Sequence, residues 1–139
     1  MTSETKTERY APSAIEPKWQ AHWASTRLHD TPNDGDEPNF YFLTAFPYPS
    51  GDVHVGHWYA YAPADCAARF IRMKGHNVLF PMGFDAFGIN AENAAIDRHL
   101  HPAVWTEKNM GQMREQFMRM GAAIDWRREV ITCYPEYYR

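Results

Sequence analysis

The chain alternates between apolar residues at helical spacing and short runs that are almost entirely apolar. In residues 11–24, Ile15, Trp19 and Trp23 recur every fourth position and therefore share one face of a helix. Residues 28–39 are rich in Pro, Gly, Asp and Asn, which is typical of an exposed loop. Further helices are predicted at residues 54–74, from residue 91 onward and at residues 102–120, with Gly75 and Gly121 placed to end two of them.

Three apolar runs are typical of strands. They are residues 40–46 and 77–83, each expected to be buried on both faces, and residues 129–134. Pro47 and Pro49 end the first run, because proline has no N–H to donate to a sheet ladder. The order strand, helix, strand, helix, helix, strand predicts an α/β protein with a parallel sheet and right-handed crossovers.

The loops after the first two strands have the most unusual composition in the chain. FPYPSGDVHVGH, residues 46–57, follows the first strand, and GFDAFG, residues 83–88, follows the second. Ligands of open parallel sheets bind outside the carboxyl ends of the strands. The two loops are therefore expected to face one crevice.

His54 and His57 flank Gly56 at the predicted start of a helix, where unpaired backbone N–H groups attract anions. Imidazoles there can donate hydrogen bonds to phosphate oxygens during phosphoryl or nucleotidyl transfer, and Gly56 would let a flat base lie on the backbone. The alternative is that both histidines cap the helix or pack in the core, and the pattern alone leaves both open. A metal site is disfavoured, because no further ligand recurs at a suitable spacing.

Asp85 is the second unusual residue, because it follows a strand and lies between apolar neighbours. Its carboxylate could hold a substrate ammonium; alternatively, it shapes a turn or caps a helix. Phe46 and Tyr48 border the same crevice and could line an apolar pocket, or they could be ordinary core residues. Residues 127–131 are interpreted as a solvated edge beside a strand.

Composition changes this picture only slightly. The 139 residues are 45% apolar and 15% aromatic, enough for a packed core that is expected to include Met113, Phe117 and Met120. A net charge of −3 provides no basic surface for nucleic acid. Cys66 and Cys133 form no CxxC pattern, and nothing resembles a signal peptide or a membrane span, so we expect a cytoplasmic protein without membrane contact.

These segments together resemble the start of class I leucyl-tRNA synthetases. The resemblance lies in FPYPSGDVHVGH, in RFIRMKGHNVLFPMGFDAFGINAENAA, and in the flanking YAPSAIEPKWQAHW, HPAVWTEKNM and DWRREVITCYPEYYR. HxGH marks class I synthetases broadly, whereas the FPYPSG lead-in and the DAFG loop point to the leucine enzymes. Nearly the whole chain beyond its first few residues is covered.

The resemblance implies a Rossmann-like catalytic domain that binds ATP, with its Mg²⁺, and leucine at the strand ends. Leucine would be activated to leucyl-adenylate and then transferred to the 3′ end of tRNA(Leu). The resemblance assigns catalysis to His54 and His57, ATP binding to Pro49, His54, Gly56 and His57, leucine binding to Phe46, Tyr48 and Asp85, and a metal to no residue.

We expect residues 1–10 to be a disordered tail and residues 11–139 to be the first half of the catalytic domain. No KMSKS-type lysine loop, editing insertion or anticodon-binding segment occurs, so tRNA(Leu) would be bound by the remainder of the polypeptide. The segment alone is expected to be inactive and poorly folded, with Val104, Met113, Phe117 and Trp126 lacking partners. Two other classes stay open: a small HxGH nucleotidyltransferase and a non-catalytic module derived from a synthetase.

Overall fold

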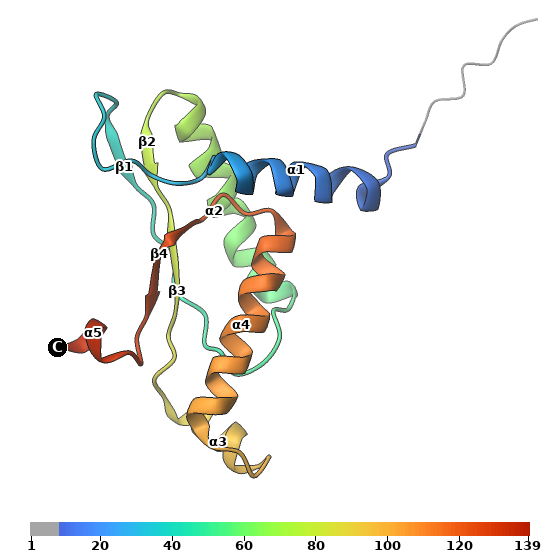
Figure 1. The fold of residues 1–139 in the computed structure, drawn as a ribbon, viewed down its shortest axis with the longest axis vertical. Coiled ribbons are helices and arrows are strands. Elements are labelled where there is room, and N and C mark those ends of the chain that lie inside the picture. Colours follow the sequence, from blue (N-terminus) through green and yellow to red (C-terminus); the bar gives the residue numbers. More distant parts are fainter. Residues whose placement is uncertain (1–8) are drawn as a thin grey trace, which may run out of the picture.

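The computed structural model describes residues 9–139, and its ribbon is shown in Figure 1. The expected disordered tail lies, apart from Arg9 and Tyr10, outside the described residues. The elements follow in the order α1 (Pro12–Thr26), β1 (Asn39–Tyr41), α2 (Val55–Met73), β2 (Asn77–Leu79), β3 (Pro81–Phe84), α3 (Ile89–Ile96), α4 (Pro102–Met120), β4 (Asp125–Ile131) and α5 (Pro135–Tyr138).

All strand pairs in the described part of the chain are parallel. β1 pairs with β2, with Asn39 opposite Asn77, and β3 pairs with β4, with Phe84 opposite Ile131. Figure 1 shows α2 and α4 on the same side of these strands, and both helices contribute buried side chains to one core. The predicted α/β class with a Rossmann-like parallel sheet is confirmed.

The sequence predicts three strands, whereas the described residues contain four, with different bounds. β1 stops at Tyr41, because the chain leaves the ladder after the N–H of Phe42 bonds to the Leu79 carbonyl at 2.8 Å. All three residues of β1 are exposed, so the expectation that this strand is buried on both faces is wrong. The run 77–83 divides at Phe80: β2 pairs with β1, whereas β3 pairs with β4. The last strand begins at Asp125 rather than at residue 129.

The helix ends follow the sequence signals closely. Pro102 opens α4 in its first turn, and Gly121 ends it with a φ of +72°. Gly75 follows α2 with a φ of +85°, a conformation that glycine adopts without steric cost. The third predicted helix begins at Ile89, two residues earlier than expected.

The core contains most of the residues expected there. Met113 and Phe117 are fully buried, so the expectation that they lack partners in this segment is wrong; Phe117 also packs against Trp126, with ring centroids 6.5 Å apart. Met120 packs against the same core and is partly buried. Exposed apolar side chains are spread over several elements; those on α1, α2 and α4 include Trp19, Val55, Tyr59, Phe70, Met73 and Val104.

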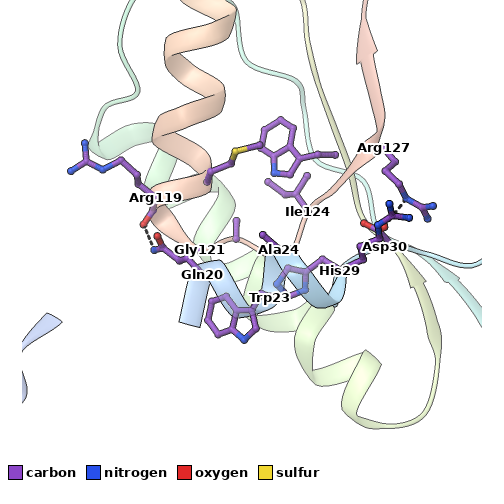
Figure 2. A pocket seen from close by; sticks show the side chains of 13 residues that line it. Gln20, Trp23, Ala24, His29, Asp30, Arg119, Gly121, Ile124 and Arg127 are labelled. Atoms are coloured by element: carbon purple, nitrogen blue, oxygen red, sulfur yellow. Dashed lines mark hydrogen bonds and ion pairs between the residues drawn. The ribbon is translucent and has the colours of Figure 1, made fainter. Parts of the chain in front are cut away.

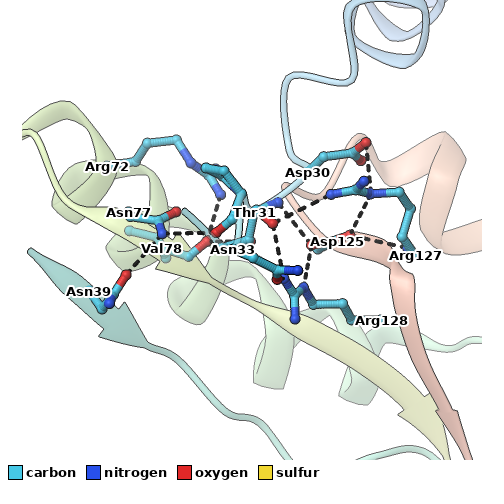
Figure 3. A network of polar contacts seen from close by, with 11 residues as sticks. Asp30, Thr31, Asn33, Asn39, Arg72, Asn77, Val78, Asp125, Arg127 and Arg128 are labelled. Atoms are coloured by element: carbon cyan, nitrogen blue, oxygen red, sulfur yellow. Dashed lines mark hydrogen bonds and ion pairs between the residues drawn. The ribbon is translucent and has the colours of Figure 1, made fainter. Parts of the chain in front are cut away.

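A buried carboxylate joins the loop after α1 to the sheet (Figure 3). Asp125 is fully buried, and its two oxygens accept the N–H groups of Thr31 at 2.9 Å and of Arg127 at 3.1 Å. The Arg128 guanidinium lies 3.3 Å from the same carboxylate, and Arg127 pairs with Asp30 at 2.9 Å. Residues 127–131 are thus part of β4 itself, and the interpretation of a solvated edge beside a strand is wrong.

Candidate active site

The two loops with unusual composition are adjacent in the structure. The backbone N–H of Asp85, just after β3, donates to the carbonyl of Pro47 at 3.0 Å. This bond joins the loop before α2 to the loop after β3, as expected for segments that follow the carboxyl ends of parallel strands.

His54 and His57 form a reciprocal cap at the start of α2. Nδ1 of His54 accepts the N–H of Gly56 at 3.1 Å, and Nδ1 of His57 accepts the N–H of His54 at 3.2 Å. The two ring centroids lie 4.0 Å apart. The capping alternative is therefore correct as a description of Nδ1, and these two backbone N–H groups are not available to an anion.

The same bonds fix where each imidazole carries its proton. A ring nitrogen that accepts a hydrogen bond holds no proton, so each ring carries its N–H at Nε2. No partner is assigned to either Nε2 among residues 9–139, and His54 is exposed. Burial, and then the neighbouring His54, lowers the pKa of His57, which keeps its ring neutral at pH 7. The pair presents two N–H donors from the end of a helix.

The ring of His57 packs against two aromatic side chains. Tyr61, one turn later on α2, lies nearly parallel to it at 6.3 Å between centroids, and Phe117 of α4 lies edge-on at 6.5 Å. The Tyr61 hydroxyl donates to the Ala45 carbonyl at 2.7 Å, and burial raises its pKa to about 12. This packing restricts the positions that the imidazole can take.

Gly56 is required by His54 itself. A Cβ at this position would lie 2.9 Å from Cε1 and 3.0 Å from Nδ1 of the His54 ring, closer than such atoms normally approach. An alanine would push the imidazole out of its cap. The structure thus gives this glycine a steric reason that is independent of any bound base.

Asp85 is half-buried between the buried Phe84 and Ala86, and its side chain has no hydrogen-bond or ionic partner among the described residues. Phe46 packs against the core and lies over Gly83, whereas Tyr48 is 56% exposed. Pro49 is fully buried. The predicted site residues thus lie on two joined loops, with an unpaired carboxylate on one and an imidazole pair on the other.

Sequence reasoning missed the polar residues of α4 that contact the loop before α2. They are Asn109, Gln112 and Gln116, which bond to Pro49, Asp52 and Val53. Their spacing of three and four residues is the only sequence signal, because it places three amides on one face of an otherwise ordinary helix.

A separate cavity of about 270 Å³ lies between α1, the end of α4 and the start of β4 (Figure 2). Its lining includes Trp23, His29 and Ile124 but none of the predicted site residues. Burial lowers the pKa of His29 to about 4, and the positive charges of Arg69 and Arg72 act in the same direction. This ring is therefore neutral at pH 7. Because none of the predicted site residues lines it, the cavity is not part of the site on the two loops.

Neither a metal cluster nor a membrane span occurs in the described part of the chain. Residues 9–139 contain no group of three or more His, Cys, Asp or Glu side chains that could hold a metal ion. Among the same residues, no helix is both long enough and apolar enough to cross a membrane.

The chain matches known proteins over most of its length. Residues 40–128 match the family model described as tRNA synthetases class I (M). The chain belongs to the class I tRNA synthetases. Leucine–tRNA ligases of Dehalococcoides mccartyi and Rubrobacter xylanophilus are 54% and 57% identical to this synthetase segment, over 95% and 94% of it.

Solved synthetase structures have the same fold. The ternary LeuRS–tRNA–LeuAMS complex of Agrobacterium radiobacter K84 superposes with a TM-score of 0.89 at 37% identity, over 93% of this chain and 17% of that one. Methionyl-tRNA synthetase of Mycobacterium tuberculosis, solved with methionyl-adenylate, gives 0.61 at 30% identity, over 71% and 19%. The present chain spans 16% of the length of the two leucine–tRNA ligases named above.

Proposed function

We propose that this chain supplies part of the catalytic site of a leucine–tRNA ligase. The observation that carries the proposal is identity of 54–57% to leucine–tRNA ligases over nearly all of the segment. The TM-score is also higher against the leucine complex than against the methionine enzyme. The protein would act in the cytoplasm, and the remainder of the polypeptide would bind tRNA(Leu).

The reaction would begin with nucleotidyl transfer. A carboxylate oxygen of leucine attacks the α-phosphorus of ATP, a new P–O bond forms, and the bond to pyrophosphate breaks. His54 and His57 are suited to this step, because their Nε2–H groups can donate to phosphate oxygens as negative charge builds. A ribose hydroxyl of tRNA(Leu) then attacks the leucyl carbonyl, and AMP leaves.

Magnesium would reach the site bound to the phosphates of ATP. The imidazole pair fits phosphate rather than a metal ion, because the Nδ1 lone pairs are already occupied and Nε2 carries a proton. When present, Mg²⁺ would neutralise charge on the phosphates. The contribution of this chain is to orient the two donors; Pro49 and Gly56 support the loop that would contact ATP.

Leucine would lie between the two joined loops. The unpaired carboxylate of Asp85 can accept hydrogen bonds from an α-ammonium, and its half-buried position makes that contact stronger than an exposed one. Phe46 and Tyr48 would form the apolar wall for the side chain. The alternatives, a small nucleotidyltransferase or a non-catalytic module, predict no leucine-dependent reaction.

The proposal is tested by leucine-dependent exchange of pyrophosphate into ATP, measured with the full-length protein. His57→Ala is expected to lower kcat about a hundredfold, as for loss of one preorganised transition-state donor, with little change in the KM for leucine. His22→Ala, an exposed histidine on α1, is the control and should match wild type. Wild-type protein that exchanges with methionine but not leucine, or with neither, contradicts the proposed function.

Asp85→Ala should raise the KM for leucine by at least about tenfold, because a bound ammonium would lose its charged partner, while the KM for ATP changes little. Asp85→Asn separates charge from shape, and Asp36→Asn in the exposed loop before β1 serves as the control. Normal leucine binding together with a lowered melting temperature would instead identify Asp85 as a turn residue.

A further inference from the structure

One face of α4 holds the loop that leads into the histidine pair. Asn109, Gln112 and Gln116 share this face, and each donates a side-chain hydrogen bond to the segment between Pro49 and Val53. The partners are about 60 residues apart in the sequence, so these bonds connect two elements that chain continuity does not hold together.

Gln116 makes the most specific of these contacts. Its Oε1 accepts the backbone N–H of Val53 at 2.8 Å, and its Nε2 donates to Oδ1 of Asp52 at 2.9 Å. Gln112 donates to the same Asp52 oxygen. One amide therefore fixes two consecutive residues and uses both its acceptor and its donor.

Asn109 anchors the other end of the same loop. Its Nδ2 donates to the carbonyl of Pro49 at 2.9 Å, and both residues are buried. A buried carbonyl without this donor would lack a hydrogen-bond partner, which is unfavourable. The loop is thus held to α4 at both of its ends.

The anchored loop determines where the imidazoles lie. Val53 immediately precedes His54, whose carbonyl accepts the N–H groups of His57 at 2.9 Å and Trp58 at 3.3 Å to start α2. The same helix α4 also contacts the His57 ring through Phe117. A displacement of residues 52 and 53 would therefore displace both Nε2 donors.

We propose that Gln116, together with Gln112 and Asn109, is a positioning residue that sets the geometry of the His54–His57 pair for the nucleotidyl step. The assignment rests on the proposed function. Misplacing a catalytic group by about 1 Å can slow a reaction about a hundredfold. These amides therefore affect turnover although they do not touch the substrates.

Gln116→Glu tests this without changing side-chain size. The carboxylate keeps an acceptor for Val53 but places a negative charge against Asp52, so kcat for leucine-dependent exchange in the full-length protein should fall about tenfold. The KM for leucine and the melting temperature should stay near the wild-type values. Lys108→Gln, exposed on α4, makes the same change in net charge and should leave kcat unchanged.

Asp52→Asn in the same protein provides the rescue. The asparagine amide can donate to the carboxylate introduced by Gln116→Glu, so the double variant should recover most of the lost kcat. A general loss of stability would not be repaired by that second change. Hydrogen exchange at the Val53 amide should be faster in Gln116→Glu and slower again in the double variant.

Wild-type kcat in Gln116→Glu, or a loss that Asp52→Asn does not restore, would overturn the positioning role while the proposed function stands. A wild-type protein without leucine-dependent exchange would overturn the proposed function and this assignment with it.

Discussion

Gly83→Ala is expected to destabilise the folded protein by at least about 3 kcal/mol, the upper range for overpacking a core. A Cβ at this position in β3 would overlap the carbonyl oxygen of Val130 and lie 3.0 Å from Cε2 of Phe46. The first contact is with backbone, which cannot move away without breaking the pairing of β3 with β4. Denaturant unfolding of the full-length protein measures the change.

Gly111→Ala is the matched control for this substitution. Gly111 lies inside α4 and a Cβ there would meet no atom within 4 Å. Alanine should therefore stabilise the helix, by up to about 1 kcal/mol. If Gly83→Ala unfolds at the wild-type denaturant concentration, β3 and β4 are not as close as described.

Asp125→Ala is expected to cost about 2–3 kcal/mol, because it leaves the buried N–H of Thr31 without an acceptor and removes the carboxylate that the half-exposed Arg127 and Arg128 contact. The N–H of Thr31 and the guanidinium of Arg128 would lose the carboxylate that they share in Figure 3. The segment from Asp30 to Asn33 should then detach from β4. Thermal melting, together with proteolysis within residues 28–39, would detect both effects.

Two further variants separate the causes of that loss. Asp125→Asn keeps one acceptor oxygen but removes the charge, so its loss should be smaller than that of Asp125→Ala. Asp34→Ala, at an exposed position in the same loop, should be neutral. Equal stability of Asp125→Ala and wild type would show that the buried carboxylate is not needed to hold the loop.

Local signals in the sequence predicted the ends of elements well. α4 begins at Pro102 and ends before Gly121, as expected. Proline has a fixed φ and glycine readily adopts a positive φ, so both signals depend on the residue itself. The position of the site at two loops after strands was also predictable, since it follows from the order of the elements. From the HxGH pattern, helix capping and phosphate binding were alternatives. The two roles are compatible, because Nδ1 of each histidine caps the helix and Nε2 remains able to donate to a phosphate.

Long-range pairing is what the sequence could not provide. The run from 77 to 83 looks like one strand, but Phe80 is where the chain exchanges β1 for β4 as a neighbour. The burial of Asp125 could not be predicted from its neighbours in the sequence, because the N–H that its carboxylate accepts belongs to Thr31, 94 positions away. Gln116 likewise acquires its role only through its distant contact with Val53.

The parallel pairing also sets an order of events while the protein is being synthesised. Asn39 of β1 pairs with Asn77, so β1 has no partner until about 40 further residues have been added. At roughly 5–20 residues per second, that interval is on the order of 2–8 s. β3 waits for a similar time for β4. Neither parallel pair can form before its second strand has been synthesised, and a slower ribosome lengthens that wait in direct proportion.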